Sequence, residues 1–309
     1  MKRVLVTGLS GFIGRHALPE LILRGFEVHA ISSIERPDSV AVHWHQADLL
    51  GKTNDVRSVV ERIQPTHVLH LAWHTTPCSF WSSPENEQWQ AASTELFQHC
   101  ADSGVQRIVG AGSCAEYAWN ETPCDERLTP LEPTSLYGQT KHATHTSLIQ
   151  TSDEAGISAA WGRVFFMYGP GAHSNRMPGV VISALMNGEF ANCSHGEQLR
   201  DFIHIRDAAN ALVSVLDSEI TGPVNIASGD PVRIKDMVLT VADHFDARDR
   251  IRFGAVASNP NEPHEICANV ERLRNELNWS PKFDLTSGIK DTVNWWQDTA
   301  PPILEKQVA

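Results

Sequence analysis

Long apolar segments and clusters of positive charge are both absent from this sequence. Lys and Arg total 25 against 37 Asp and Glu, so the formal net charge is −12, and no stretch gathers the basic residues. Nucleic acid is therefore not expected as a partner, because binding it requires a basic surface. No segment is apolar for long enough to span a bilayer, and the apolar run in MKRVLVTGLSG (1–11) is too short for a signal peptide. We expect a cytoplasmic protein that does not bind membranes.

Metal-binding and redox motifs are missing as well. The sequence has 6 cysteines and 15 histidines, but it has no C-x-x-C pair and no H-E-x-x-H array. In a reducing compartment this pattern predicts buried free thiols, and no metal ion is expected. The cysteines are Cys78, Cys100, Cys114, Cys124, Cys193 and Cys267.

The remaining composition is that of a globular protein. The chain has 309 residues, of which 41% are hydrophobic and 20% charged, enough for a sizeable core and about two domains. Short apolar segments alternate with helical ones through the first half, as in KRVLVT (2–7), EVHAI (27–31), HVLHLA (67–72) and RIVGAG (107–112). That alternation predicts an α/β fold built on a Rossmann-type, doubly wound parallel sheet.

The second half of the chain follows a different pattern. After ISAAWGRVFFMYGP (157–170), which predicts one more strand, Gly- and Pro-rich loops break the alternation. We expect residues 1–165 to form the Rossmann domain, with later segments around 202–228 returning to it. Residues 166–309 are expected to form mainly a smaller α/β domain for the substrate.

Glycines occupy the turn after the first predicted strand. TGLSGFIG (7–14) places Gly8, Gly11 and Gly14 three residues apart. The first permits a tight turn, the second lets the backbone approach a pyrophosphate, and the third lets the helix pack on the strand. Because the motif lies between a strand and a helix, it predicts a dinucleotide site.

The end of the second predicted strand indicates which dinucleotide binds. An NAD site usually has an acidic residue there for the ribose 2′-hydroxyl, but this chain has Ser32 and Ser33, followed by Arg36. Hydroxyl and guanidinium groups suit a 2′-phosphate, so NADP (NADPH) is expected. Glu35, if turned inward, would favour NAD. Asp48 is placed either to meet the adenine ring or to cap the following loop.

A tyrosine and a lysine lie one helical turn apart in TSLYGQTK (134–141), in a chain with only 3 tyrosines. Positions i and i+4 share a helix face, so Lys141 could lower the pKa of Tyr137 and make it a general acid. Taken alone, the pair could also be an accident of composition.

Together these motifs resemble the extended short-chain dehydrogenase/reductases that act on nucleotide sugars. TGLSGFIG, HLA (70–72), the serine of AGSCAEY (111–117), YGQTK, R-V-F-F-M-Y-G-P (163–170) and LRDFIHIRD (199–207) occur in the family's order over nearly the whole chain. The resemblance implies an NAD(P)-dependent oxidoreductase in which Ser113 hydrogen-bonds the substrate oxygen, Tyr137 exchanges its proton, and Lys141 holds the ribose. The expected cofactor-binding residues are Gly8, Gly11, Phe12, Ile13, Gly14, Ser32, Ser33, Arg36, Asp48, Leu49, Leu71, Ala72, Tyr137 and Lys141.

Departures from the family narrow the expected reaction. Dehydratases on this scaffold carry an Asp-Glu or Ser-Glu pair just after the catalytic hydroxyl residue. This chain has Cys114 and Ala115 there, so 4,6-dehydration is not expected. GDP-fucose synthases carry a cysteine two residues after the serine. Cys114 is one position off, so combined epimerisation at C3 and C5 is not expected either.

The residues expected at the substrate are Trp73, His74, Cys114, Phe166 and Arg200. Arg200 resembles the arginine that clamps the substrate diphosphate, although it could instead pair with Asp201 at the surface. Phe166 stands where the family often has Asn, and it adds aromatic surface. Trp73 and His74 either line the sugar pocket or form a packed tryptophan beside a solvent-facing histidine.

The expected function is an NADPH-dependent reductase of a nucleotide-linked 4-keto-6-deoxy sugar, with hydride transfer at C4 and Tyr137 as general acid. The alternative is a nucleotide-sugar 4-epimerase that retains NAD. A non-catalytic NADP-sensing protein is disfavoured, because a sensor has no chemical reason to keep Ser113, Tyr137 and Lys141.

The expected partners are a nucleotide-diphosphate sugar and a second copy of the chain. Relatives often dimerise through helices that correspond to residues 86–103 and 137–153. Leu96 and Phe97 could supply apolar surface to such a homodimer, or they could be buried within the monomer.

Overall fold

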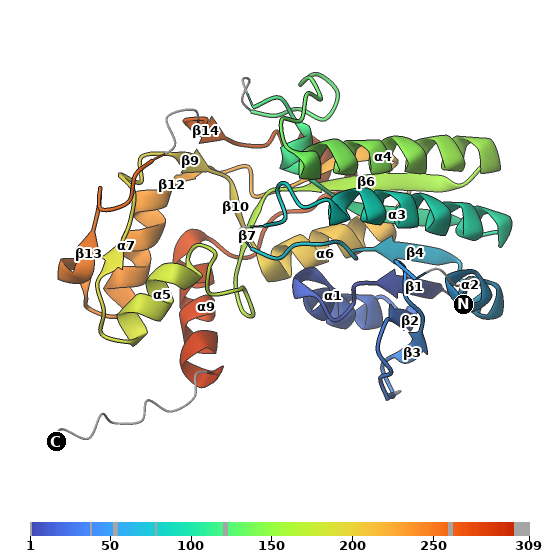
Figure 1. The fold of residues 1–309 in the computed structure, drawn as a ribbon, viewed down its shortest axis with the longest axis horizontal. Coiled ribbons are helices and arrows are strands. Elements are labelled where there is room, and N and C mark those ends of the chain that lie inside the picture. The colour runs from blue at the N-terminus through green and yellow to red at the C-terminus, as the bar shows by residue number, and fades with distance from the viewer. Residues whose placement is uncertain are drawn as a thin grey trace.

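A seven-stranded sheet forms the centre of the protein (Figure 1). The computed structural model describes residues 2–37, 39–51, 55–77, 79–119, 123–258 and 262–299. The strand order is β11-β6-β5-β4-β1-β2-β3, and every neighbouring pair is parallel. The strands are β1 (Arg3–Thr7), β2 (Glu27–Ser32), β3 (His43–Gln46), β4 (His67–His70), β5 (Arg107–Ser113), β6 (Ser158–Val164) and β11 (Gly222–Ile226). The expected doubly wound parallel sheet is confirmed, and its direction of winding reverses between β1 and β4, where such folds bind ligands.

Both faces of the sheet are covered by helices. Val4 and Val6 of β1 belong to one buried cluster with residues of α1 (Phe12–Leu23) and α6 (Ile205–Leu216). Leu5 between them belongs to the opposite cluster, with residues of α2 (Asp55–Ile63), α3 (Glu85–Asp102) and α4 (Leu136–Ala155). Successive side chains of a strand point to opposite faces, so a strand buried on both sides is continuously apolar.

Most elements after β6 form a second group beside the sheet (Figure 1). Its own core includes Ile182, Val238, Ile289 and Val293, all fully buried. The short strands are β7 (Phe166–Tyr168), β8 (Ala191–Asn192), β9 (Leu199–Arg200), β10 (Phe202–His204), β12 (Val232–Arg233), β13 (Ile251–Arg252) and β14 (Glu265–Ile266). The helices of this group are α5 (Gly179–Met186), α7 (Ile234–His244) and α9 (Leu285–Thr299). Helix α8 (Glu271–Leu277) packs instead against β11 and α6 at the large sheet. Two 3-10 turns lie at Cys114–Glu116 (η1) and Arg248–Arg250 (η2).

The chain crosses between the two groups more than once. The expected single strand over 157–170 is divided into β6, in the large sheet, and β7, which pairs with β10 outside it. The chain then returns through α6, which packs against α1, and β11, which pairs with β6. The boundary between residues 165 and 166 stays a prediction.

The structure also shows where the apolar dimer candidates and the cysteines lie, and whether any helix could span a membrane. Leu96 and Phe97 are buried in the monomer core, so they supply no apolar surface to a dimer. The described cysteines are buried and form no disulfide with one another: Cys100, Cys114, Cys124, Cys193 and Cys267. Cys78 lies outside the described residues. Among the described helices, none is both long and apolar enough to cross a membrane.

Candidate active site

The glycine motif forms the turn that joins β1 to α1. Gly8 has a φ of 72°, and a Cβ there would lie 2.7 Å from the backbone nitrogen of Ala72. A Cβ at Gly14 would lie 2.3 Å from the Gly8 carbonyl oxygen. Both contacts are too close for a side chain, so this turn requires glycine.

A cleft of about 690 Å³ opens beside this turn. Its walls include the N-terminus of α1 and the segment after β4. The expected cofactor residues along it are Gly8, Gly11, Phe12, Ile13, Gly14, Leu71 and Ala72. A cradle of bare backbone at a helix N-terminus fits the pyrophosphate of a dinucleotide.

The residues expected at the adenine end are only partly brought together. At the end of β2, the Arg36 Nε donates a hydrogen bond to the Ser32 Oγ (3.2 Å), and the guanidinium lies 5.1 Å from the centroid of the Trp44 ring. Ser33 and Glu35 are exposed. A guanidinium held against a serine hydroxyl is a suitable partner for a 2′-phosphate.

Asp48 and Leu49 lie outside the set of residues that line this cleft, whereas Leu50 is part of it. The Asp48 Oδ1 accepts a hydrogen bond from the Leu50 amide (3.1 Å), and its carbonyl accepts one from the Gly51 amide. Asp48 therefore caps the turn after β3, which is the alternative role expected for it.

The expected catalytic residues converge at the carboxyl end of β5. Ser113 is the last residue of β5, and its buried hydroxyl accepts a hydrogen bond from the Ala115 amide. Tyr137 and Lys141 share one face of α4, which Ser135 caps by accepting a hydrogen bond from the Gly138 amide (3.1 Å). Ser113, Tyr137 and Lys141 all line one cavity of about 380 Å³.

Tyr137 is enclosed by two aromatic residues that the sequence did not indicate. The Phe80 ring lies 4.9 Å from the Tyr137 ring and the Trp81 ring 5.7 Å from it, both edge-on. The Trp81 carbonyl also accepts a hydrogen bond from the Tyr137 amide (3.1 Å). These contacts fix the phenol at the wall of the cavity.

The pKa of Tyr137 is opposite in direction to the expected one. Burial raises it to about 12, although the hydrogen bond with Ser113 acts to lower it. The expectation of an acidified phenol rested on Lys141, but the Lys141 Nζ donates to the Ala111 carbonyl (2.8 Å). Without the cofactor, Tyr137 is therefore a protonated phenol at neutral pH, ready to donate a proton.

Lys141 is itself strongly perturbed. Burial lowers the pKa of its ammonium to about 7, and Glu116 acts weakly in the opposite direction. The Nζ lies 3.8 Å from the centroid of the Trp73 ring, whose Nε1 donates to the Asn86 Oδ1 (2.8 Å). A buried amine that titrates near neutrality is typical of a functional site.

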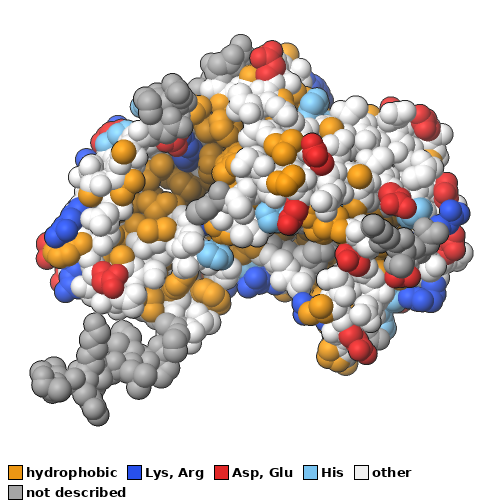
Figure 2. Space-filling model, viewed as in Figure 1, with side chains coloured by type: hydrophobic (Ala, Val, Ile, Leu, Met, Phe, Trp, Pro, Cys, Tyr) orange, Lys and Arg blue, Asp and Glu red, His pale blue; other side chains and the backbone are white. Residues whose placement is uncertain are grey.

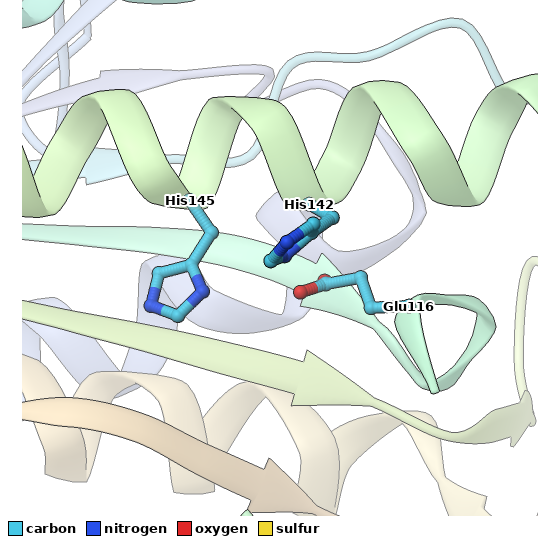
Figure 3. Close-up of side chains that lie close together, drawn as sticks. All are labelled: Glu116, His142 and His145. Carbon is cyan, nitrogen blue, oxygen red and sulfur yellow. The ribbon is translucent and has the colours of Figure 1, made fainter. Parts of the chain in front are cut away.

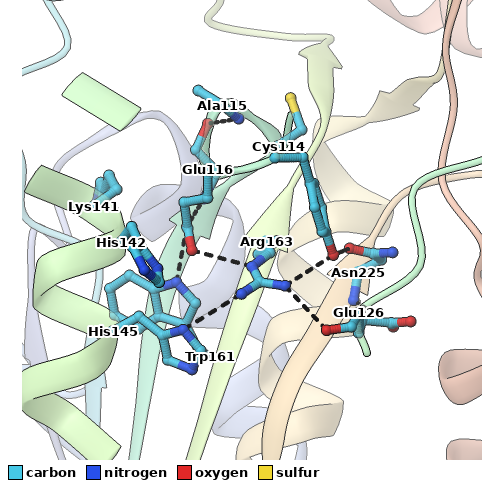
Figure 4. Close-up of polar contacts among 12 residues, drawn as sticks. Cys114, Ala115, Glu116, Glu126, Lys141, His142, His145, Trp161, Arg163 and Asn225 are labelled. Atoms are coloured by element: carbon cyan, nitrogen blue, oxygen red, sulfur yellow. Dashed lines mark hydrogen bonds and ion pairs between the residues drawn. The ribbon is translucent and has the colours of Figure 1, made fainter. Parts of the chain in front are cut away.

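A buried polar network around Glu116 and Arg163 (Figure 4) binds the backbone of Ser113. The Glu116 Oε1 accepts hydrogen bonds from the Ser113 amide (2.8 Å) and the Trp161 Nε1 (2.9 Å), and its Oε2 accepts from the Arg163 Nε (3.1 Å). Glu116 and Arg163 are fully buried. Glu116 was not predicted from the sequence, although the spacing of Ser113 and Glu116 is that of a capping box, which the structure forms.

Glu116 also lies near two histidines of α4 (Figure 3). One ligand atom each of Glu116, His142 and His145 lies within 4.8 Å of the others. Both Glu116 oxygens already accept N–H donors, and one of these donors is the guanidinium of Arg163. A metal cation here would be repelled by Arg163, so we propose no metal at this cluster.

The substrate side of the cavity is rich in aromatic residues. Phe166, Cys114, Trp73 and Arg200 line it, together with Phe80, Trp81 and Phe202. Figure 2 shows a hollow bordered by hydrophobic side chains beside the elements that form this cavity. Trp73 thus lines the pocket, whereas the His74 Nδ1 pairs with a Glu85 carboxylate oxygen (2.7 Å) at the adjoining cleft.

Arg200 does not pair with Asp201. Its buried guanidinium forms an ion pair with Glu262, and its Cζ lies 5.8 Å from the centroid of the Phe166 ring. Asp201 is fully buried and accepts hydrogen bonds from the amides of Ser228 and Gly229 instead. Arg200 also lines the catalytic cavity, with its guanidinium paired to Glu262.

Comparison with known proteins identifies the family. The NAD dependent epimerase/dehydratase family matches residues 4–227. The chain is similar to UDP-glucuronic acid decarboxylase 1 of Xenopus tropicalis, with 24% identity over 96% of this chain and 72% of that protein. It is also similar to UDP-glucuronate 4-epimerase 4 of Arabidopsis thaliana, with 26% identity over 95% of this chain and 75% of that protein.

Solved structures share the fold. A UDP-N-acetylglucosamine 4-epimerase from Methanobrevibacter ruminantium M1 superposes with a TM-score of 0.86 at 23% identity, over 97% of this chain and 99% of that one. MoeE5, in complex with UDP-glucuronic acid and NAD, superposes with a TM-score of 0.82 at 26% identity, over 96% and 100% of the two chains. The fold, the glycine cleft and the family match together show an extended short-chain dehydrogenase/reductase, an enzyme of the NAD-dependent oxidoreductase type. The chain belongs to the NAD dependent epimerase/dehydratase family.

Proposed function

We propose that this enzyme epimerises a nucleotide sugar at C4 and retains its nicotinamide cofactor through the cycle. The observation that carries the proposal is the convergence of Ser113, Tyr137 and Lys141 in one cavity beside the glycine-rich cleft. Similar proteins include UDP-glucuronate 4-epimerases, and MoeE5 binds NAD with a UDP-sugar. These likenesses favour the epimerase over the reductase expected from the sequence.

The residues divide the chemical work. A bound nicotinamide dinucleotide supplies the hydride acceptor and donor. As a phenolate, Tyr137 would take the proton of the sugar hydroxyl while hydride leaves C4, and the resulting phenol would return the proton when hydride returns. The Ser113 hydroxyl hydrogen-bonds the same sugar oxygen. A charged Lys141 beside the phenol would lower the pKa of Tyr137 from the value of about 12 that burial imposes.

Arg200 binds the other end of the substrate in this proposal. Its guanidinium can clamp a diphosphate, provided that Glu262 releases it. Phe166 and Phe202, whose rings lie 5.9 Å apart, offer apolar surface beside it.

A second candidate is the NADPH-dependent 4-ketosugar reductase. The contact between Arg36 and Ser32 at the end of β2 favours it, because it suits the 2′-phosphate of NADPH. A reductase consumes NADPH and releases NADP, whereas an epimerase consumes none.

The test is product formation with a limiting amount of cofactor. The protein is incubated with UDP-sugars and substoichiometric NAD, and the C4 epimers are quantified by proton NMR. Product in excess of cofactor supports the epimerase. Turnover of a 4-keto sugar nucleotide with one NADPH oxidised per product would show the reductase instead, and absence of both would overturn the assignment of this site.

A further inference from the structure

Arg176 places a guanidinium at the junction of the two cavities. It lies between β7 and α5 and lines both the glycine cleft and the catalytic cavity. Its Nη2 donates to the Thr75 carbonyl (3.0 Å), and its Cζ lies 5.4 Å from the centroid of the Phe80 ring. In the part of the chain that the structure describes, no carboxylate forms an ion pair with it. A partly buried guanidinium that lacks a counter-charge is costly unless a ligand supplies one.

The other charges of the cavity are already engaged. Glu262 is the acidic residue among the described lining residues, and it pairs with Arg200. The Lys141 ammonium donates to the Ala111 carbonyl and lies over the Trp73 ring. Among the described lining residues, Arg176 and Lys141 are thus the cations without a carboxylate partner. Burial lowers the pKa of Lys141 to about 7, whereas a guanidinium stays protonated, so Arg176 carries the lasting unmatched charge.

The two arginines lie against different aromatic walls. Arg200 contacts Phe166, whereas Arg176 contacts Phe80, whose ring is edge-on to Tyr137 at 4.9 Å. Burial lowers the pKa of Arg176, while Tyr137 acts to raise it, so the two groups interact electrostatically. Arg176 thus belongs to the reacting end of the cavity, where the sugar ring must lie if Tyr137 serves its C4 oxygen.

We propose that Arg176 binds a carboxylate on the sugar ring, so that the substrate is an acidic nucleotide sugar, a uronate. This inference rests on the proposed function. The planar guanidinium can donate two parallel N–H bonds to a carboxylate. A hydroxymethyl group at the same ring position would leave the positive charge unmatched, and sites with buried charges discriminate strongly against ligands that leave them unpaired.

The experiment compares two probes that differ in this group alone. UDP-glucuronate carries a carboxylate where UDP-glucose carries a hydroxymethyl, and both are titrated calorimetrically into the full-length protein in the presence of NAD. The wild-type protein is expected to bind UDP-glucuronate at least about tenfold more tightly than UDP-glucose. In Arg176→Met, which keeps the chain length but not the charge, the ratio is expected to fall to within about threefold of unity, with UDP-glucose affinity nearly unchanged. Arg176→Lys should restore part of the preference.

Matched outcomes separate this inference from the proposed function. Arg200→Met is the control, because losing a diphosphate-binding residue should weaken the binding of both probes by the same factor. Equal wild-type affinity for the two probes would show that Arg176 does not bind a sugar carboxylate. An equal loss of affinity for both probes in Arg176→Met would show the same. Either result would leave the nucleotide-sugar assignment standing. If neither probe nor UDP binds, both proposals are wrong. Retained binding of UDP-glucose shows that the variants are folded.

Discussion

The ammonium of Lys141 lies 3.8 Å from the centroid of the Trp73 ring and donates a hydrogen bond to the Ala111 carbonyl. The side chain is 4% exposed, and burial lowers its pKa to about 7. The Trp73 indole thus covers one of the residues on which the proposed chemistry depends. Its burial also gives Lys141 a measurable effect on stability.

Stability should depend on pH through Lys141. Between pH 7 and the ordinary lysine value near 10.4, the unfolded chain binds a proton that the folded protein does not. The free energy of unfolding of the cofactor-free wild type, relative to that of Lys141→Met, should therefore rise with pH in this window, by up to about 1.4 kcal/mol per unit. Urea denaturation at pH 7.0 and 9.5 measures the difference. Lys290→Met, which changes an exposed lysine of α9, should show no such slope. A flat difference for Lys141→Met would contradict the lowered pKa.

Removing the phenolic hydroxyl should stop the chemistry without weakening cofactor binding. Tyr137→Phe keeps the ring against Phe80 and Trp81 but loses the proton donor, so turnover should fall by about 100-fold or more. Cofactor affinity, measured by quenching of protein fluorescence, should change little. Turnover near the wild-type rate would show that another group moves the proton.

Removing one partner of the buried ion pair between Glu116 and Arg163 should destabilise the protein strongly. Glu116→Gln leaves the fully buried Arg163 without its counter-charge, which should lower the free energy of unfolding by roughly 3–5 kcal/mol. Glu61→Gln removes one partner of the exposed pair between Arg57 and Glu61 on α2 and serves as the control, with no measurable change expected. A small effect of Glu116→Gln in urea denaturation would show that the network tolerates the lost charge.

Arg36 should control the choice between the two dinucleotides. Because its guanidinium can pair with a 2′-phosphate, Arg36→Gln should weaken NADPH binding by about tenfold or more and leave NADH binding nearly unchanged. Fluorescence titration of the cofactor-free protein with each dinucleotide tests this. Glu35→Gln is the companion variant: if it selectively weakens NADH, the acidic side chain binds the ribose and the preference for NADP is wrong.

The sequence was sufficient to predict the sheet, the glycine turn and the cluster of Ser113, Tyr137 and Lys141. The sheet was predicted from strand alternation, the glycine turn from its place between a strand and a helix, and the pair of Tyr137 and Lys141 from their spacing of one helical turn. Ser113 was assigned through the resemblance of its motif to the family. Phe80, Trp81 and Arg176 lie in loops, where the sequence has no helical or strand periodicity. Their positions at the cavity could therefore not be predicted from the sequence. The shift predicted for the pKa of Tyr137 had the wrong direction for the same reason. The burial that raises this pKa depends partly on Phe80 and Trp81, which lie in such a loop.

The central claim, a nucleotide-sugar 4-epimerase that keeps its cofactor, is tested most directly with substrate deuterated at C4. The protein converts this UDP-sugar in the presence of an excess of unlabelled, free NADH, and the product is examined by mass spectrometry and NMR. Retention of deuterium at C4 of the epimer is the predicted result, because the hydride that leaves the sugar returns to it on the same bound nicotinamide. Loss of the deuterium to the free cofactor pool, or a product that forms only as NAD(P)H is consumed, would contradict the account.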